Sequence, residues 1–211
     1  AASFLGIPLS TMYSKIKKGD IRSMRKVLQL LSIVVVGIAV ALMLISPELV
    51  LIFGSPKYRE AVYVIPPVAA SVFFIFIYNI LSMPQFYYEK TQFLMAASMA
   101  AAGANVVLNF IFIRLFGYIA AGYTTLACYM LYSVGHYIVS KRILVNEGIQ
   151  ENLMSPGFLV ACSVFLIGAS IICNLIFPYR ILRYAILLAS AGLVFWKKEL
   201  LLKTMADIRK K

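Results

Sequence analysis

The sequence predicts an all-α protein that crosses a membrane several times, and its composition and hydropathy pattern support this prediction. Of the 211 residues, 62% are hydrophobic and only 13% are charged, which is more apolar surface than a soluble domain of this length can bury. The apolar residues gather in six stretches, and most of these reach the roughly 20 residues that a helix needs to cross a bilayer. We therefore expect six transmembrane helices, over residues 27–46, 61–83, 93–113, 118–139, 157–177 and 181–196.

The charges predict how the chain is threaded. It has 20 Lys and Arg residues against 8 Asp and Glu residues, a net charge of +12. Fifteen of the basic residues fall in the first, third, fifth and seventh segments outside the apolar stretches, and five lie in or next to the alternate segments. Cytoplasmic segments are enriched in Lys and Arg, so we expect both ends to be cytoplasmic and membrane lipids to surround the chain. Because the basic residues flank apolar stretches and form no groove with interleaved aromatic residues, we expect no nucleic-acid partner.

The same pattern divides the chain into five parts. Residues 1–26 read as the end of a preceding helix followed by a basic cytoplasmic loop, and 27–140 as four packed helices. Residues 141–156 form a cytoplasmic loop, 157–198 the last two transmembrane helices, and 199–211 a basic cytoplasmic tail with helical spacing of apolar residues. The chain does not begin with Met, and we expect it to be the C-terminal part of a longer protein.

Local signals refine the first two helices. Asp20 is expected to cap the helix that becomes the first span. Residues 47–60 are expected to form a short connection on the outer side. Pro66 and Pro67 lie about two turns inside the second stretch, where proline removes a backbone hydrogen bond and kinks a helix. Two interpretations of this kink are open: a broken helix at a transport site, or a static kink packed by neighbouring helices.

The third stretch carries both small and polar residues. Alanine and glycine are frequent between residues 96 and 104, which predicts close packing against another helix. Asn105 and Asn109 follow at i, i+4 spacing and so lie on one face. They can form an interhelical hydrogen bond or line a polar pathway. Arg114, at the outer end, can extend its guanidinium to the membrane surface or contact an anionic substrate.

Candidate catalytic or metal-binding groups are few. His136 is the single histidine and can act as an interfacial hydrogen-bonding group or as a proton relay, although no carboxylate shares its span. The three cysteines fall inside apolar stretches without metal-ligand spacing. Phosphate-binding, nucleophile and metal motifs do not occur, so we expect no catalytic residue, no metal, no cofactor and no enzymatic activity.

Three sequence runs resemble a known family. They are PQFYYEKT (residues 84–91), NVVLNFIFI (105–113) and GYIAAGYTT (117–125), with SPE (46–48), FG (53–54) and YREA (58–61) upstream. In this order they resemble the C-terminal part of Wzx-type polysaccharide flippases. These belong to the superfamily that also contains the MATE exporters and the lipid II flippase. The resemblance covers about residues 5–145 well and the last two helices by topology alone.

The resemblance implies a fold, a substrate and a location. The fold would be a MATE-like lobe with two extra C-terminal helices, in the inner membrane of a bacterium. It would move undecaprenyl-diphosphate-linked oligosaccharide from the cytoplasmic to the outer leaflet by alternating access, with polysaccharide assembly proteins as further partners. Gly117 and Gly122 would form a tight outer turn. The substrate pathway would include Tyr88, Asn105, Asn109 and Arg114.

Two other functions are consistent with a helical membrane protein of this kind. A MATE-like small-molecule antiporter would share the fold, but the runs at residues 84–91 and 117–125 favour the flippase. A membrane-bound polysaccharide ligase or polymerase would need catalytic residues in a large outer loop, and no outer connection is long enough.

Overall fold

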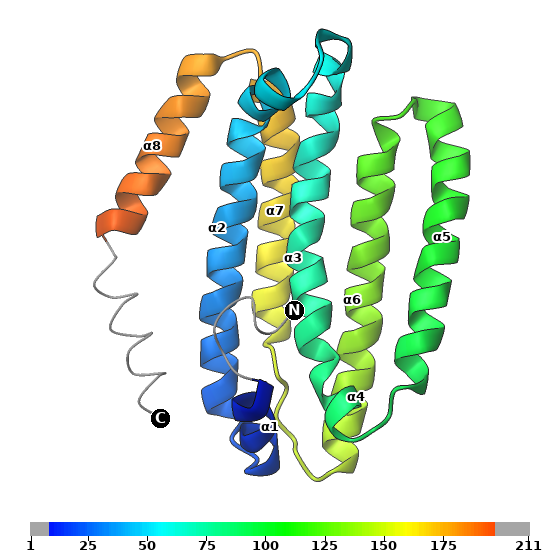
Figure 1. The fold of residues 1–211 in the computed structure, drawn as a ribbon. Coiled ribbons are helices and arrows are strands. Elements are labelled where there is room, and N and C mark those ends of the chain that lie inside the picture. Colours follow the sequence, from blue (N-terminus) through cyan, green and yellow to red (C-terminus); the bar gives the residue numbers. More distant parts are fainter. Residues whose placement is uncertain (1–8, 197–211) are drawn as a thin grey trace.

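The computed structural model describes residues 9–196, and every regular element in that range is helical (Figure 1). Each of the six predicted stretches overlaps one long helix, which confirms the all-α prediction. The elements are α1 (Leu9–Lys17), α2 (Ile21–Phe53), the 3₁₀ helix η2 (Pro56–Val64), α3 (Ile65–Leu81), α4 (Met83–Tyr87), α5 (Gln92–Phe116), α6 (Ala120–Asn146), α7 (Pro156–Ile176) and α8 (Arg180–Trp196). The predicted tail at 199–211 and residues 1–8 lie outside the described range.

Helix α3 is the centre of the bundle. It packs against α2, α6 and α7, while α5 packs mainly on α6 and α8 makes few contacts with α2 and α7 (Figure 1). The core lies where these helices meet, and Phe73 and Ile77 of α3 and Met43 of α2 are at most 1% exposed. The structure therefore has a compact centre with α5 and α8 at its two margins.

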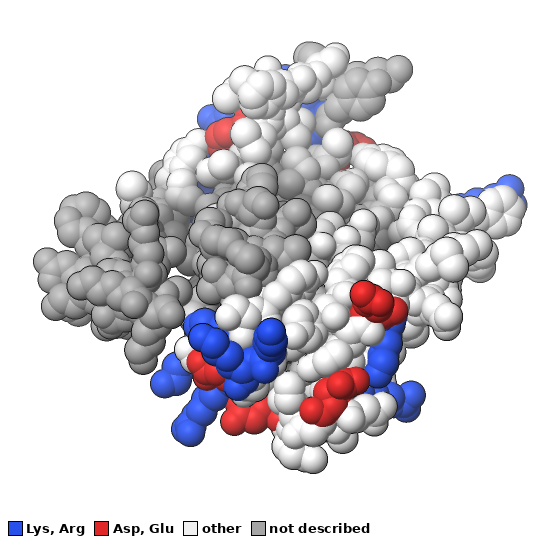
Figure 2. All heavy atoms as spheres, turned by 60° about the horizontal axis from the view of Figure 1, so that its bottom comes forward, with Lys and Arg blue, Asp and Glu red and all other residues white. Residues whose placement is uncertain are grey.

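The two ends of the bundle differ in charge. One end carries α1, α4 and the α6–α7 connection, and we call it the basic end; the opposite end carries η2, residues 117–119 and the α7–α8 connection. Charged side chains gather on the basic end, whereas much of the described surface shown above them carries no Lys, Arg, Asp or Glu (Figure 2). Two ion pairs lie here, Arg25–Glu151 at 3.5 Å and Lys90–Glu147 at 3.2 Å.

Four helical runs within residues 9–196 are long and apolar enough to cross a membrane. They are Ile21–Phe53, Arg59–Tyr87, Gln92–Phe116 and Pro156–Ile176. Helix α6 is 27 residues long but less apolar, and α8 has only 17 residues. The structure thus has the character of a membrane-embedded helical protein, and the count of six spans stays a prediction.

The start of α2 follows the sequence prediction only in part. The Asp20 carboxylate accepts a hydrogen bond from the backbone N–H of Ser23 at 3.2 Å, which confirms the predicted helix cap. The expected basic loop is much shorter than predicted, however, because α1 continues to Lys17 and α2 already begins at Ile21. Most of the basic residues in this region therefore project from helices.

Residues 47–60 do not form the predicted connection. Helix α2 continues through Pro47 to Phe53, and η2 follows three residues later. Proline has no N–H to donate to the carbonyl of residue 43, and the Ser46 hydroxyl donates to that Met43 carbonyl instead, at 2.8 Å. This local substitution lets the helix pass a residue that would otherwise end it. Glu48, predicted to lie in a loop, is therefore a helical residue.

Pro66 and Pro67 do not lie in the interior of a helix, where the sequence predicts a kink. Both prolines are buried and stand in the first turn of α3, directly after the 3₁₀ helix η2. The first turn tolerates proline because its N–H groups have no partner within the helix. The prolines therefore mark a change of helix type at the start of α3, and they do not interrupt its interior.

Helix α5 lacks the close packing that its small residues predict. None of its residues is buried, and an added Cβ at Gly103 would meet nothing within 4 Å. Ala97 and Ala101 are half-buried on the α6 side, whereas Ala96 and Ala100 are exposed. The small residues therefore serve the contact with α6 only in part.

Candidate functional site

A groove with tyrosines on its wall runs between α5 and α6. Its volume is about 460 Å³. We call it the tyrosine groove. The polar residues that line it are Tyr78 of α3, Ser98 and Asn105 of α5, and Thr125, Tyr129 and Tyr132 of α6. None of its lining residues is charged. It thus offers hydroxyl, amide and aromatic groups on a largely apolar floor.

The three tyrosines are held in a fixed arrangement. The rings of Tyr78 and Tyr129 are nearly parallel at 6.4 Å, and Tyr78 and Tyr132 are 4.7 Å apart. The hydroxyls of Tyr132 and Ser98 are hydrogen-bonded at 2.6 Å, which joins α6 to α5. The Ser133 hydroxyl donates to the Phe74 carbonyl at 2.9 Å and so fixes α6 on α3. Three helices therefore position the aromatic wall.

The two predicted asparagines have different partners. Asn109 receives a hydrogen bond from the Thr124 hydroxyl of α6, and its own amide donates to the Asn105 side chain at 2.9 Å. Asn109 therefore links the two helices, whereas Asn105 also lines the tyrosine groove. Asn109 thus forms the expected interhelical hydrogen bond, and a polar pathway at Asn105 stays a prediction.

The turn at residues 117–119 brings α6 close to α3. Gly117 ends α5 with φ of +76°, a conformation that favours glycine. Gly122 is buried in the first turn of α6, where a Cβ would lie 2.8 Å from the Pro67 Cγ and 3.0 Å from the Val64 carbonyl oxygen. Only glycine allows this approach, so Gly122 of the predicted turn meets Pro67 of the predicted proline pair.

A second groove between α5 and α6 lies nearer this turn and is apolar. Its volume is also about 460 Å³. We call it the apolar groove. Its larger lining residues include Leu108, Phe112 and Phe116 of α5 and Tyr123 of α6. Helical periodicity places its α6 residues on a different face from those of the tyrosine groove. The same helix pair therefore offers one polar and one apolar recess.

A buried polar pair lies beyond the tyrosine groove, toward the basic end. Gln85 Nε2 of α4 is 2.8 Å from His136 Nδ1 of α6, and both side chains are 0% exposed. The rings of Tyr132, Phe93 and Tyr78 surround the imidazole at 4.5, 5.4 and 5.8 Å. The histidine was a candidate from its residue type, but its partner is 51 residues away and could not be predicted from the sequence.

Two predicted pathway residues lie elsewhere. Tyr88 is half-buried just after α4 at the basic end; removal from water raises the pKa of its hydroxyl, and the nearby Glu147 carboxylate raises it further. Arg114 is exposed at the opposite end, with its guanidinium 3.9 Å over the Phe110 ring. The structure therefore does not bring Tyr88 and Arg114 into the groove that contains Asn105.

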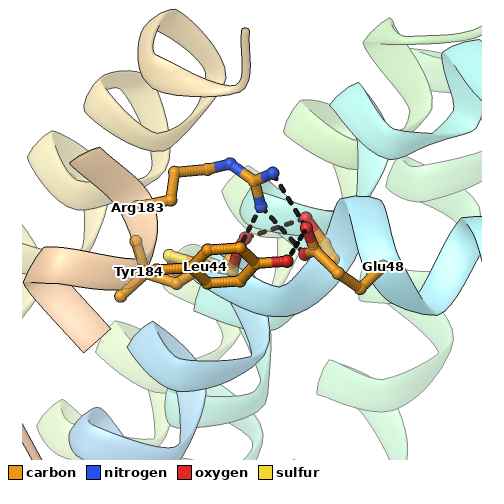
Figure 3. Close-up of polar contacts among 6 residues, drawn as sticks. Leu44, Glu48, Arg183 and Tyr184 are labelled. Atoms are coloured by element: carbon orange, nitrogen blue, oxygen red, sulfur yellow. Dashed lines mark hydrogen bonds and ion pairs between the residues drawn. The ribbon is translucent and has the colours of Figure 1, made fainter. Parts of the chain in front are cut away.

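One buried arginine, Arg183, could not be predicted from the sequence. Figure 3 shows the Arg183 side chain of α8 directed at Glu48 of α2; Nη1 and Nη2 donate to the two carboxylate oxygens at 2.9 Å each. Nη1 also donates to the Leu44 carbonyl at 2.8 Å, and the Tyr184 hydroxyl donates to Glu48 at 2.8 Å. Glu48 and Arg183 are 135 residues apart, so no local pattern in the sequence could have signalled the pair.

The described residues define a class of protein but no family. Residues 9–196 form a helical protein with several membrane-length apolar helices, and its three cysteines are free thiols. Within this range no group of three or more His, Cys, Asp or Glu residues could hold a metal ion. No family model, curated protein or solved structure compared with this chain matches it.

Proposed function

We propose that this chain takes part in moving lipid-linked oligosaccharide units across a bacterial inner membrane, from the cytoplasmic to the outer leaflet. The observation that carries the proposal is the pair of grooves on α5 and α6. A lipid-linked saccharide has a polar, hydroxyl-rich part and a long hydrocarbon part. The tyrosine groove supplies aromatic faces and hydrogen-bonding groups for the first, and the apolar groove suits the second.

The charges fit an orientation for this reaction. In our proposal the basic end faces the cytoplasm and binds the surface of the inner leaflet, as cytoplasmic segments of membrane proteins do. No charged residue lines either groove, so the diphosphate is held by cations outside them. The carrier is undecaprenyl diphosphate, and alternating access exposes the saccharide first to one side and then to the other.

The proposal is tested by reconstitution. Vesicles that contain the protein and a fluorescent lipid-linked oligosaccharide are treated with an impermeant quencher, and the protected fraction is followed over time. We expect the protein to accelerate loss of protection, and Tyr132→Leu to slow it about tenfold because the groove loses an aromatic wall and a hydrogen bond. The matched control is Tyr179→Leu, since Tyr179 is 64% exposed and lies outside both grooves.

Three outcomes would contradict this function. One is that wild-type protein fails to accelerate flipping, and another is equal loss of rate in the Tyr132 and Tyr179 variants. The third test uses the organism. We expect a strain that lacks the gene and has no second flippase to lose surface polysaccharide and to accumulate lipid-linked units on the inner leaflet. Normal surface polysaccharide in that strain would exclude the proposal, and export of a small organic cation would favour the antiporter.

A further inference from the structure

The tyrosine groove contains hydrogen-bonding groups that the described protein does not use. No hydrogen bond joins the Asn105 amide nitrogen, the Thr125 hydroxyl or the Tyr129 hydroxyl to another described residue, and all three side chains are half-buried. By contrast, the hydroxyls of Ser98 and Tyr132 are hydrogen-bonded to each other. The three unused groups are therefore available to a ligand in the groove.

Helical spacing brings the polar groups of two helices to this one groove. Thr125, Tyr129 and Tyr132 of α6 stand at positions i, i+4 and i+7, and Ser98 and Asn105 of α5 are seven residues apart. Residues with these spacings share one face of a helix, and both faces line the groove. A ligand in the groove can therefore contact polar groups on two opposite walls.

The unused groups are uncharged, and their chemistry matches a neutral sugar. The Asn105 amide nitrogen can only donate a hydrogen bond, whereas the Thr125 and Tyr129 hydroxyls both donate and accept. The hydroxyl, ring-oxygen and acetamido groups of a neutral sugar supply the complementary donors and acceptors, and the C–H face of its ring can lie on a tyrosine ring. A carboxylate only accepts, and it brings a negative charge that these groups do not neutralise.

The basic residues of the three helices that line the groove lie far from it. Helix α3 contains no Lys or Arg. The nearest basic residues on the other two helices are Arg114 of α5 and Lys141 of α6, each nine residues from the nearest polar groove residue, Asn105 and Tyr132. Nine residues are two and a half turns, which places these charges about 13 Å along the helix and on its opposite face. An ionised carboxylate in the groove would therefore lose water without gaining a counter-charge, which is costly.

We propose that the tyrosine groove selects saccharides by charge, so that it binds neutral and acetamido sugars in preference to sugars that carry a carboxylate. Asn105, Thr125 and Tyr129 are the residues that determine this specificity. The inference rests on the proposed function, because that function places the saccharide in this groove. It adds the substrate class, which is a lipid-linked unit whose sugars in the groove are uncharged.

Two ligands that differ in charge but not in their sugar rings test this specificity. They are trigalacturonic acid and its methyl ester. The full 211-residue chain is placed in nanodiscs of zwitterionic lipid, and saturation-transfer NMR measures the Kd of each ligand, with empty nanodiscs as the blank. Salt at about 0.15 M screens the long-range attraction of an acid to a chain of net charge +12. We expect the ester to bind about tenfold more tightly than the acid.

A cation introduced into the groove should remove this preference. Thr125→Lys adds the charge on α6 and Asn105→Lys adds it on α5, and in each variant we expect the acid to bind about tenfold more tightly than it binds the wild-type protein. The matched control is Tyr179→Lys, which adds the same charge at a residue that is 64% exposed and lies outside both grooves. This control should keep the wild-type preference for the ester. The comparison of the two ligands on the wild-type protein is decisive even if neither groove variant folds.

The binding data are independent of the flipping assay, so the two proposals can fail separately. Wild-type protein that binds the acid as tightly as the ester, or binds neither ligand, would overturn the selection by charge. An unchanged preference for the ester in folded Thr125→Lys and Asn105→Lys would place the binding site elsewhere and would also overturn it. Flipping of lipid-linked oligosaccharide by that same protein would leave the flippase proposal standing. Selective binding of the ester by a protein that flips nothing would overturn the flippase proposal alone.

Discussion

The ion pair between α2 and α8 predicts unequal effects of removing its two members. Arg183 is 1% exposed, whereas the Glu48 side chain is 23% exposed. Glu48→Gln leaves the guanidinium buried without its counter-charge, and breaking a buried pair in this way costs about 3–5 kcal/mol. One acceptor oxygen and the Leu44 carbonyl remain, so we expect the lower end, about 3 kcal/mol.

Removal of the arginine should be milder. After Arg183→Met, the Glu48 carboxylate can turn toward solvent and keeps the Tyr184 hydroxyl, and the Leu44 carbonyl loses the hydrogen bond from Arg183. We expect a loss of about 1–2 kcal/mol. In the double variant Glu48→Leu/Arg183→Met no charge is buried, and the free energy of unfolding should return to within about 1 kcal/mol of wild type.

The assay is reversible unfolding of the purified protein in mixed micelles with increasing SDS, with hydrogen exchange of α8 amides as the local readout. The matched control is Glu60→Gln, because Glu60 lies at the same end of the bundle but its hydrogen bond from Tyr118 is exposed; its effect should stay within about 0.5 kcal/mol. Equal losses in Glu48→Gln and Arg183→Met, or a Glu48→Gln loss no larger than that of the control, would refute the reasoning.

Three further substitutions test the packing and backbone arguments by the same SDS unfolding. Gly122→Ala should destabilise by about 1–3 kcal/mol because its Cβ meets the Pro67 ring, whereas Gly103→Ala, in open space, should not destabilise. Glu89 has φ of +56°, so Glu89→Gly should stabilise by about 1 kcal/mol, and Glu89→Ala, which only removes the charge, should not. Thr124→Val leaves the Asn109 oxygen without its donor and should lower the free energy of unfolding by about 1 kcal/mol. An unchanged free energy of unfolding would mean that this hydrogen bond makes no net contribution to stability.

The helices were predictable because membrane length and apolar composition are local properties of the sequence. Every predicted stretch overlaps a long helix, and the cap at Asp20 was predicted from a residue type and its position. The end of the first helix was not predictable in the same way. Proline at position 47 normally stops a helix, and α2 continues past it because the Ser46 hydroxyl donates to the Met43 carbonyl that the proline leaves free.

The candidate site was predictable only where its contacts are local. Asn105 and Asn109 share a face by helical spacing, and the structure places them together. Gln85 and His136 are 51 residues apart, and Glu48 and Arg183 are 135 apart. No periodicity in the sequence states which helices are neighbours, so these pairs become visible only when α4 and α8 are placed against α6 and α2.

The contact between Arg183 and α2 also has a consequence for biosynthesis. The guanidinium bonds a carbonyl that lies 139 residues earlier in the chain. A ribosome that adds roughly 5–20 residues per second completes α8 about 7–29 s after the end of α2. A carboxylate without its counter-charge is costly to bury, so we expect the Glu48 part of α2 to stay at the membrane surface until then. We therefore expect α2 to reach its final position in the membrane only after α8 has been synthesised and Arg183 has paired with Glu48.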